Sequence, residues 1–350
     1  MINYLRLLLL PFSVLYGIVV IIRNMMYDLG LFKSVEFDLP VICAGNIAVG
    51  GSGKTPVTEY LLHLLKDKKI AILSRGYGRR TKGFIIAGHT ATAETIGDEP
   101  MQFFRKFPQV TVAVCEDRVK GIKQLKDDHD LIILDDAFQH RAVKPGLSIL
   151  LFEYQKLLKP QFLLPAGNMR EPFNGYKRAD LILITKAPST LQHNQKEVCL
   201  DHFPGERRKD VTFSFLEYAD LHHLYTAETR TMDQIKQDTE IFLLSGIANP
   251  GPLLEHLYKY TANVHHFDYP DHYSFKPGDI TRLIEKFNKQ NTGAKLIITT
   301  EKDMQRLSGR TFRELLLNLP VFYLPVKIAI SQEDKVNFDQ KILNYVAGIT

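Results

Sequence analysis

The sequence predicts an α/β protein whose main domain is a mostly parallel sheet between two layers of helices. Short runs of Val, Ile and Leu alternate with helical stretches from residue 40 onwards. These runs are apolar on both faces, which is typical of strands buried between two helix layers. We expect strands at 41–44, 70–74, 110–114, 131–134, 148–152 and 181–185, with helices between them such as 55–66 and 118–125.

The composition is that of an ordinary globular protein with a mild excess of positive charge. The chain has 350 residues, which is enough for two domains with sizeable cores. Its net charge of +5 favours an anionic partner, such as a nucleotide, a nucleic acid or an acidic lipid, without choosing among them. Cys43, Cys115 and Cys199 lie far apart and form no metal-type pair. We therefore expect free, buried thiols in a reducing compartment.

The N-terminal segment is unusually apolar. Residues 7–22 are nearly continuous apolar sequence between Arg6 and Arg23, and this run is slightly short for a bilayer span. No small-residue cleavage signature follows it, which argues against a signal peptide. We predict that residues 1–30 form a helix at the cytoplasmic membrane interface, with both arginines at headgroup level. The alternative is a core helix of the domain that follows.

Residues 40–55 form a short apolar run that leads into a glycine-rich turn and then into a helix. Backbone N–H groups in such a turn can surround phosphate oxygens, and the helix start adds partial positive charge. Lys54 can reach the β- and γ-phosphates, and the Thr55 hydroxyl can bind Mg²⁺. Ala48 replaces the first glycine of the general pattern, and the alternative is a turn that merely closes a βα unit. We predict that a nucleotide contacts Gly50, Gly51, Ser52, Gly53, Lys54 and Thr55.

Acidic residues stand at two further points where ligands bind in such folds. Asp135 and Asp136 directly follow the apolar strand at 131–134, where many nucleotide-binding proteins hold Mg²⁺. Paired acids are also common in surface turns, but the fully apolar strand favours the metal role. Asp98 and Glu99 stand at a helix start, and alone such a pair is more often a helix cap than a catalytic site.

Three loops combine charged groups with turn residues. Residues 74–80 interleave glycines with cations and Tyr77, so this loop could bind a second phosphate, a nucleic-acid backbone or lipid headgroups. The alternative is a solvated basic loop. Residues 164–172 are rich in Gly and Pro and carry Arg170 and Glu171. His272 lies between aromatic residues in a turn, where it is a candidate proton carrier.

The pattern changes after about residue 190. Segments 211–218 and 221–230 read as two short strands, which we interpret as a ribbon that links two halves of the chain. A second α/β unit follows, with strands expected at 240–244, 264–267, 295–299 and 321–324 and a helix from about Gly251. The expected boundaries are 1–30 for the N-terminal helix, 31–210 for the nucleotide-binding domain, 211–236 for the linker and 237–350 for the second domain.

Taken together, these segments resemble the tetraacyldisaccharide 4'-kinase family, the lipid A 4'-kinases of Gram-negative bacteria. Gln139-His140 and Arg170-Glu171-Pro172 are far more specific than the phosphate loop. The family usually has Gly in place of Ala137, and it does not keep the glycine that Ala48 replaces. Besides the apolar N-terminus, the matching segments are 49–55, 73–77, 97–100, 116–118, 134–140, 164–168, 170–172, 246–250, 271–272 and 300–303, in the family's order.

The resemblance implies an activity and a fold. The activity is transfer of the γ-phosphate of ATP, with Mg²⁺, to the 4'-hydroxyl of an acylated glucosamine disaccharide 1-phosphate. The fold is a P-loop NTPase-like α/β/α sandwich with a second, smaller α/β domain on a two-stranded β linker. The implied location is the cytoplasmic face of the inner membrane, with membrane lipids as partners and with neither nucleic acid nor an obligate protein partner.

The resemblance also implies roles for individual residues. Lys54 and Thr55 act on the phosphates and Mg²⁺, and Asp135, Asp136 and Glu171 lie near the metal. Asp98 looks like the base that accepts the sugar hydroxyl proton, paired with His272. The implied substrate-binding residues are Arg75, Tyr77, Arg79, Glu99, Arg118, Gln139, His140, Asn168 and Arg170.

Other functions share parts of this pattern. A P-loop ATPase or GTPase switch at the membrane is the main alternative, and it should hydrolyse nucleotide without an acceptor. Thr185-Lys186 lacks the Asn and the following Asp that guanine recognition requires, which argues against a GTPase. A nucleic-acid-dependent ATPase would explain the basic loop but not the apolar N-terminus, and a scaffold with a relic loop would not explain the acids after several strands.

Overall fold

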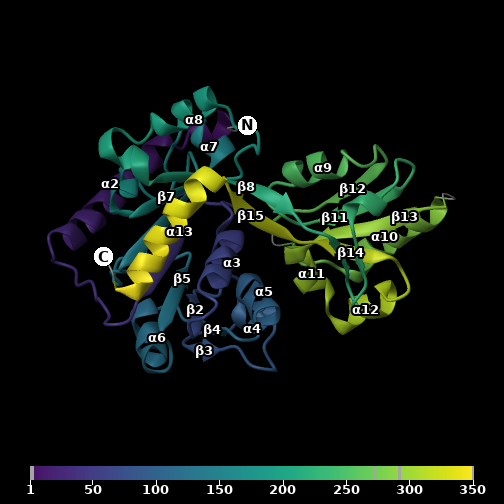
Figure 1. Cartoon of the computed structure of the whole chain (residues 1–350), viewed down its shortest axis with the longest axis horizontal. Helices are drawn as coiled ribbons and strands as arrows, with labels where there is room; N and C mark the ends of the chain where they lie inside the picture. Colours follow the sequence, from purple (N-terminus) through teal and green to yellow (C-terminus); the bar gives the residue numbers. More distant parts are fainter. Residues whose placement is uncertain (1–3, 272, 291–292, 349–350) are drawn as a thin grey trace. The chain divides into compact units, whose positions relative to one another are not determined.

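The computed structural model describes residues 4–271, 273–290 and 293–348. The chain divides into two compact units, of which the first contains residues 1–216 and 328–350 and the second contains residues 217–327. The chain passes from one unit to the other within two strands, β8 (Val211–Tyr218) and β15 (Val326–Ile330). These strands are hydrogen-bonded neighbours in the sheet of the first unit, as Figure 1 shows.

The first unit is built on one sheet with the strand order β15-β8-β7-β6-β1-β5-β2-β4-β3 among the described residues. All pairs from β8 to β4 are parallel, and β3 adds an antiparallel edge. Its other strands are β1 (Val41–Asn46), β2 (Ile70–Ser74), β3 (Ile85–Ile86), β4 (Thr111–Val114), β5 (Leu131–Asp135), β6 (Leu147–Glu153) and β7 (Leu181–Thr185).

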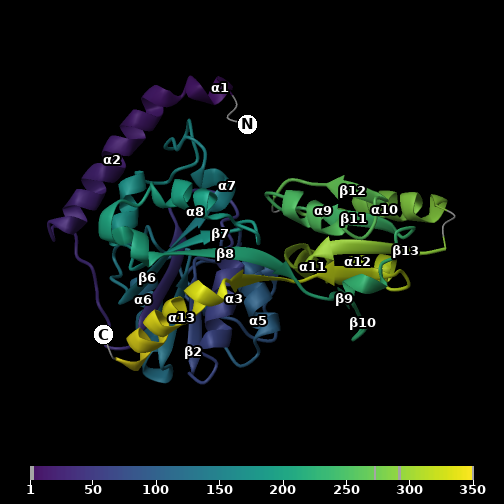
Figure 2. The ribbon, with the colours of Figure 1, turned by 45° about the horizontal axis from the view of Figure 1, so that its top comes forward.

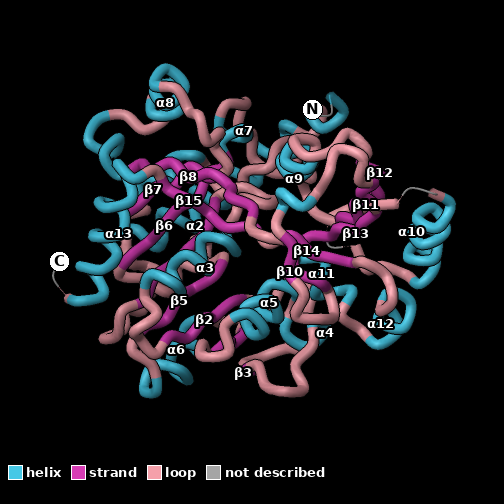
Figure 3. The backbone as a smooth tube through the Cα atoms, turned by 45° about the vertical axis from the view of Figure 1, so that its right-hand side comes forward, coloured by secondary structure: helices cyan, strands magenta, loops and turns pink. Residues whose placement is uncertain are grey.

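Helices cover both faces of this sheet. Each central strand is therefore buried along its whole length. One face packs against α3 (Lys54–Leu64), α5 (Asp98–Lys106) and α13 (Gln332–Ala347). The other face packs against α6 (Arg118–Leu125), α7 (Tyr154–Leu157) and α8 (His193–Leu200). The short α4 (Ala93–Ile96) precedes α5. Figure 3 shows the adjacent strands of the sheet with α3 and α13 beside them. The expected α/β/α sandwich is confirmed.

The strand order places a ligand-binding edge at the end of β1. From β1 the chain first moves two places along the sheet to β2, and it later returns to β5 and then to β6, on either side of β1. β1 is therefore the point at which the order of the parallel strands reverses. In open α/β sheets, ligands bind at such a point beyond the carboxyl ends of the strands.

The second unit has its own smaller sheet, with the order β10-β9-β14-β13-β11-β12 among the described residues. Its strands are β9 (Leu221–His223), β10 (Thr229–Arg230), β11 (Glu240–Ser245), β12 (Val264–Asp268), β13 (Lys295–Thr300) and β14 (Val321–Leu324). Its helices are α9 (Gly251–Leu257), α10 (Pro277–Lys289), α11 (Glu301–Leu307) and α12 (Arg310–Leu316). Two separate apolar clusters, one on each side of the sheet, form its core.

The linker and the end of the chain differ from the expected boundaries. Segment 221–230 is not the second linker strand but forms the antiparallel pair β9–β10 inside the second unit. β15, which no pattern singled out, takes the place beside β8. Residues 328–350 belong to the first unit rather than to the second domain, because α13 buries Phe338 and Ile342 in its core. The hydroxyl of Tyr345 also accepts a hydrogen bond from the Val41 N–H at 2.9 Å.

The N-terminal segment forms α1 (Tyr4–Leu7) and α2 (Leu10–Asp28), which lie at the edge of the first unit in Figure 2. By length and hydropathy α2 could cross a membrane, and only 11% of its most apolar window is buried. This exposure argues against the core-helix alternative, since a core helix is mostly buried. The exposed apolar side chains of α2 are Leu10, Phe12, Val14, Leu15, Ile18, Val19, Ile21, Ile22 and Met25.

The two arginines that flank this segment form hydrogen bonds to loops of the first unit. The Arg6 guanidinium donates hydrogen bonds to the main-chain oxygens of Pro165 and Gly167. The Arg23 guanidinium donates to the main-chain oxygen of Gln139 at 2.8 Å. Both cations therefore contact loops of the first unit, and their expected place at headgroup level stays a prediction.

Candidate active site

The phosphate loop lies between the end of β1 and the start of α3. Gly50 and Gly53 adopt φ values of +96° and +80°, in the left-handed region that side chains rarely enter. Gly53 is the residue before the first turn of α3, so its conformation aims the following N–H groups out of the helix end. Lys54 and Thr55 are the first two residues of that helix. This local structure is the one that the glycine-rich pattern predicts.

Side chains from neighbouring strands hold the loop in shape. The Asn46 amide donates to the Ser52 hydroxyl at 2.7 Å, and the Thr185 hydroxyl donates to the Ser52 carbonyl at 2.7 Å. The Lys186 ammonium donates to the Gly51 carbonyl. None of Asn46, Thr185 and Lys186 was predicted from the sequence to belong to the site. These residues lie at or just after the carboxyl ends of β1 and β7, where ligand-binding residues are expected. That the two strand ends lie near each other follows only from the order of strands in the sheet.

Three charged side chains meet beside the loop. The Lys54 ammonium lies 3.7 Å from Oδ1 of Asp136. The Arg170 guanidinium donates to both carboxylate oxygens of Asp136, at 3.0 and 3.2 Å. They come from α3, from the turn after β5 and from loop 164–172. The structure therefore brings together Lys54, Asp136 and Arg170, three of the residues singled out from the sequence.

Asp135 is a buried carboxyl group with one open oxygen. It is 2% exposed, and its Oδ1 atom has no hydrogen-bond partner among the described residues. Burial, together with the nearby carboxylates of Glu99 and Asp136, raises the pKa of Asp135 to about 8. Lys54 and Arg118 act in the opposite direction. A divalent cation would relieve this repulsion and use the open oxygen, so these acids fit a Mg²⁺ ion.

No three His, Cys, Asp or Glu side chains in the described part of the chain converge as a complete metal site. Mg²⁺ does not require one, because it is commonly bound through one or two carboxylates, water and substrate phosphates. Glu171, which was expected near the metal, accepts hydrogen bonds from Gln139 at Oε1 and from Arg178 and Asn24 at Oε2. These contacts hold the Glu171 carboxylate in place, and its expected position near the metal stays a prediction.

The raised pKa predicts how stability depends on pH. Folded protein holds a proton on Asp135 up to about pH 8, whereas the unfolded chain releases it near the ordinary aspartate pKa of 3.8. The folded state therefore binds more protons between these values, and this group's contribution to stability is lost as pH rises through that window. We expect Asp135→Asn to raise the free energy of unfolding at pH 8 by at least about 1 kcal/mol in a chelating buffer.

Urea denaturation at pH 5 and pH 8 measures this effect. The gain should shrink towards pH 5, where both proteins are neutral at this position. Asp127→Asn, which changes an exposed carboxylate, is the matched control and should not show such a pH dependence. A gain that is equal at both pH values, or absent, would contradict the charge imbalance at Asp135.

Several cationic side chains lie near His140, which follows β5. Arg118 is buried, and its guanidinium donates to the Glu116 carbonyl at 3.1 Å. Burial lowers the pKa of His140, and the charges of Arg118, Arg23 and Arg75 lower it further. His140 is therefore neutral at physiological pH, and its buried Nε2 has no hydrogen-bond partner among the described residues. This surrounding positive charge is suited to an anionic group.

Other expected substrate residues take different places. The Arg79 side chain is buried and ion-paired with Glu116, and its expected role in substrate binding stays a prediction. Tyr77 is strongly exposed. The main-chain oxygen of Asn168 accepts a hydrogen bond from the Val49 N–H at 2.8 Å and so stabilises the phosphate loop. Gln139 donates to the main-chain oxygen of Asn46 at 2.7 Å.

The expected base, Asp98, is the first residue of α5. Its neighbour Glu99 acts electrostatically on Asp135, so the start of α5 borders the acidic pair. His272, the expected partner of Asp98, lies outside the described residues. The three cysteines Cys43, Cys115 and Cys199 are buried free thiols, as expected.

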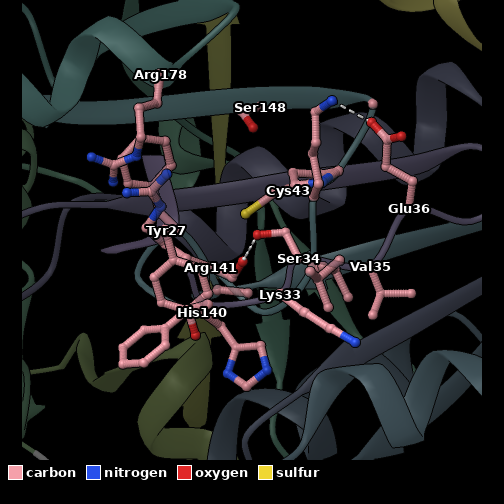
Figure 4. A pocket seen from close by; sticks show the side chains of 18 of the residues that line it. Tyr27, Lys33, Ser34, Val35, Glu36, Cys43, His140, Arg141, Ser148 and Arg178 are labelled. Carbon is pink, nitrogen blue, oxygen red and sulfur yellow. Dashed lines mark hydrogen bonds and ion pairs between the residues drawn. The ribbon is translucent and has the colours of Figure 1, made fainter. Parts of the chain in front are cut away.

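A cavity of about 1130 Å³ adjoins this site. Its lining combines the end of α2 and the turn after it with residues that follow β5. Figure 4 shows the side chains of Cys43, His140 and Arg178 among those that surround it. Two of its lining residues connect to the site, because Arg178 holds Glu171 and His140 belongs to the cationic group described above.

Comparison with known proteins gives a consistent result. A family model described as Tetraacyldisaccharide-1-P 4'-kinase matches residues 5–347. The chain is 43% identical to a tetraacyldisaccharide 4'-kinase of Flavobacterium psychrophilum, covering 99% of both chains. It is 42% identical to the enzyme of the same name from Phocaeicola vulgatus, covering 97% of this chain and 94% of the relative.

A solved structure agrees over a similar length. The crystal structure of LpxK from Aquifex aeolicus in complex with ATP superposes with a TM-score of 0.74 at 32% identity. The match covers 98% of this chain and 99% of that one. The family model and the relatives both span nearly all of the chain. The chain belongs to the tetraacyldisaccharide-1-P 4'-kinase family.

Proposed function

We propose that this protein is an ATP-dependent kinase that phosphorylates the 4'-hydroxyl of tetraacyldisaccharide 1-phosphate, the lipid A precursor. One observation carries the proposal: Lys54 and Arg170 converge on Asp136 beside a glycine-rich phosphate loop, next to the unpartnered oxygen of Asp135. The family to which the chain belongs supports the same chemistry. A hydrolytic switch is not favoured, because the matched relatives are named as kinases.

Phosphoryl transfer depends mainly on positioning and charge neutralisation. The N–H groups of the phosphate loop and of the α3 N-terminus would bind the phosphates of ATP, and Lys54 would neutralise charge on the transferred group. Thr55, Asp135 and Asp136 would hold Mg²⁺, which supplies additional positive charge to the phosphate oxygens. Arg170 would keep the Asp136 carboxylate in its orientation through two hydrogen bonds.

The acceptor would bind on the cationic side of the site. Arg75, Arg118 and neutral His140 offer charge and a free ring nitrogen to an anionic group such as the 1-phosphate. Asp98 would accept the proton of the attacking hydroxyl as the bond to phosphorus forms, assisted by His272. This assignment of base and partner follows from the family resemblance and from the place of Asp98 at the start of α5.

The direct test is ATP turnover with and without acceptor. Purified protein is supplied with ATP, Mg²⁺ and detergent-dispersed tetraacyldisaccharide 1-phosphate, and product is identified by the mass gain of one phosphate. We expect turnover to require the acceptor. Rapid ATP hydrolysis that the acceptor does not change would instead support the hydrolytic switch.

We propose that α2 lies in the cytoplasmic membrane interface and brings the site to its lipid acceptor. Its exposed apolar side chains support this location. Deletion of residues 1–22 should release much of the protein from membranes and raise the KM for the lipid more than the KM for ATP. Sedimentation with phospholipid vesicles measures the first effect. Unchanged sedimentation together with a lower melting temperature would favour a structural role for the helix instead.

A further inference from the structure

One edge of α2 is polar and faces loop 164–172 and the turn that follows β5. The Tyr16 hydroxyl donates a hydrogen bond to the main-chain oxygen of Arg170 at 2.7 Å. Arg23 donates to the main-chain oxygen of Gln139 at 2.8 Å. The Asn24 amide donates to Oε2 of Glu171 at 3.3 Å. An apolar helix that served only to attach the protein to a membrane would need none of these contacts.

The residues that α2 holds are those that shape the phosphate site. Arg170 binds the Asp136 carboxylate with its side chain, and its N–H donates to the Ile47 carbonyl at 2.7 Å. The Gln139 amide donates to the carbonyl of Asn46 at 2.7 Å and to Glu171 at 2.9 Å. Tyr16 therefore reaches Asp136 through Arg170, and Arg23 reaches Asn46, just before the phosphate loop, through Gln139. Asn24 reaches Asn46 through two residues, Glu171 and Gln139.

The helix also approaches these loops closely. Gly17 faces Leu163, and a Cβ atom at this position would lie 2.7 Å from the Leu163 Cδ1 atom. One helical turn earlier, Ser13 donates to the Leu163 carbonyl at 3.0 Å and accepts from the Ala166 N–H at 2.9 Å. These contacts fix the helix against the loop over several turns, so that the side chains further along it act from a defined position.

We propose that Tyr16, Arg23 and Asn24 are positioning residues for phosphoryl transfer, which hold Arg170, Gln139 and Glu171 against Asp136 and the phosphate loop. This inference rests on the proposed kinase function but goes beyond membrane attachment. It assigns the polar edge of α2 to the rate of the chemical step and its apolar face to the lipid. Small misplacements of such groups reduce rate, because transfer requires precise geometry.

Tyr16→Phe is the sharpest test, because it removes one hydroxyl and leaves the ring and the apolar face in place. At saturating ATP and acceptor we expect kcat to fall about fivefold, the loss that one hydrogen bond of ordinary strength gives. Combined with Arg23→Met and Asn24→Leu, the loss should reach at least about thirtyfold. The KM for acceptor and vesicle sedimentation should stay near wild type. Tyr258→Phe, which removes the hydroxyl of an exposed tyrosine in the second unit, is the matched control and should retain wild-type kcat.

A double-mutant cycle separates positioning from a general loss of stability. In an Arg170→Ala background, Tyr16→Phe should lower kcat little further, because the Arg170 guanidinium that Tyr16 positions is absent. An equal loss from Tyr16→Phe in both backgrounds would overturn the proposal. Arg23→Lys should restore part of the activity that Arg23→Met loses, since an ammonium can still donate to the Gln139 carbonyl.

Amide hydrogen exchange provides a readout without turnover. The N–H groups of Val49 and Arg170, which donate to Asn168 and Ile47, should exchange several-fold faster in the triple variant than in wild type. Unchanged exchange and unchanged kcat in an active enzyme would refute the inference. Faster exchange in a protein that phosphorylates no acceptor would instead refute the proposed function and leave the positioning role intact.

Discussion

Lys54→Ala is expected to abolish kinase activity, with a loss of at least about a hundredfold in kcat. The ammonium lies at the first turn of α3 and 3.7 Å from Asp136, where it would neutralise charge that grows on the transferred phosphoryl group. The fold should remain intact. Asp136 keeps its two hydrogen bonds to Arg170 when Lys54 is removed, so the substitution leaves no unpaired carboxylate in this position.

The measurement is kcat at saturating ATP and acceptor, with the melting temperature as a control for folding. Lys68→Ala is the matched substitution, because Lys68 is an exposed lysine shortly after the same helix. It should retain wild-type kcat. Near-normal turnover by Lys54→Ala would exclude the phosphate-loop assignment.

Local sequence predicted the strands and the phosphate loop well, because both depend on nearby residues. The strands 70–74 and 181–185 match the structure at both ends, since each is an apolar run bounded by loop residues. The phosphate loop is set by glycines that must enter the left-handed region and by the helix that starts directly after them. Neither feature needs knowledge of the sheet order.

Features that depend on long-range pairing could not be predicted in this way. β15 and α13 return to the first unit because strand β8 is available as a neighbour and because Phe338 and Ile342 complete a core formed far earlier in the chain. Segment 221–230 is polar enough to suit a linker, but its two ends pair with each other. Sequence periodicity does not specify either partner.

The same limit applies to charged residues in the site. Glu171 was expected near the metal, and its ion pair with Arg178 in the following 3₁₀ turn (Phe173–Arg178) could not be read from the sequence. Arg79 belongs to a loop that is predicted to bind anions, and in the structure one anion that it binds is the carboxylate of Glu116, 37 residues later. The cation pattern of a loop predicts that it binds anions without saying whether the anion is a ligand or a side chain of the protein.

Asp98→Asn is the second substitution expected to remove most activity. The change preserves the shape of the side chain at the start of α5 but removes its ability to accept a proton. We expect kcat to fall at least about a hundredfold, within the range that a positioned general base contributes. ATP affinity should be nearly unchanged, because the role concerns the acceptor hydroxyl. Glu94→Gln, at an exposed carboxylate just before it, is the control and should keep wild-type kcat.

His272→Ala tests whether a second residue shares this step. If Asp98 and His272 act as one unit, the double variant should be little slower than the slower single variant. Activity of the wild type should also fall as pH drops below the apparent pKa of the unit, because its protonated form cannot accept the hydroxyl proton. Losses that multiply in the double variant would mean independent roles. If both single variants kept wild-type kcat while Asp136→Ala was inactive, the base would have to be sought among the acids near Asp136, with Glu99 and Asp135 first.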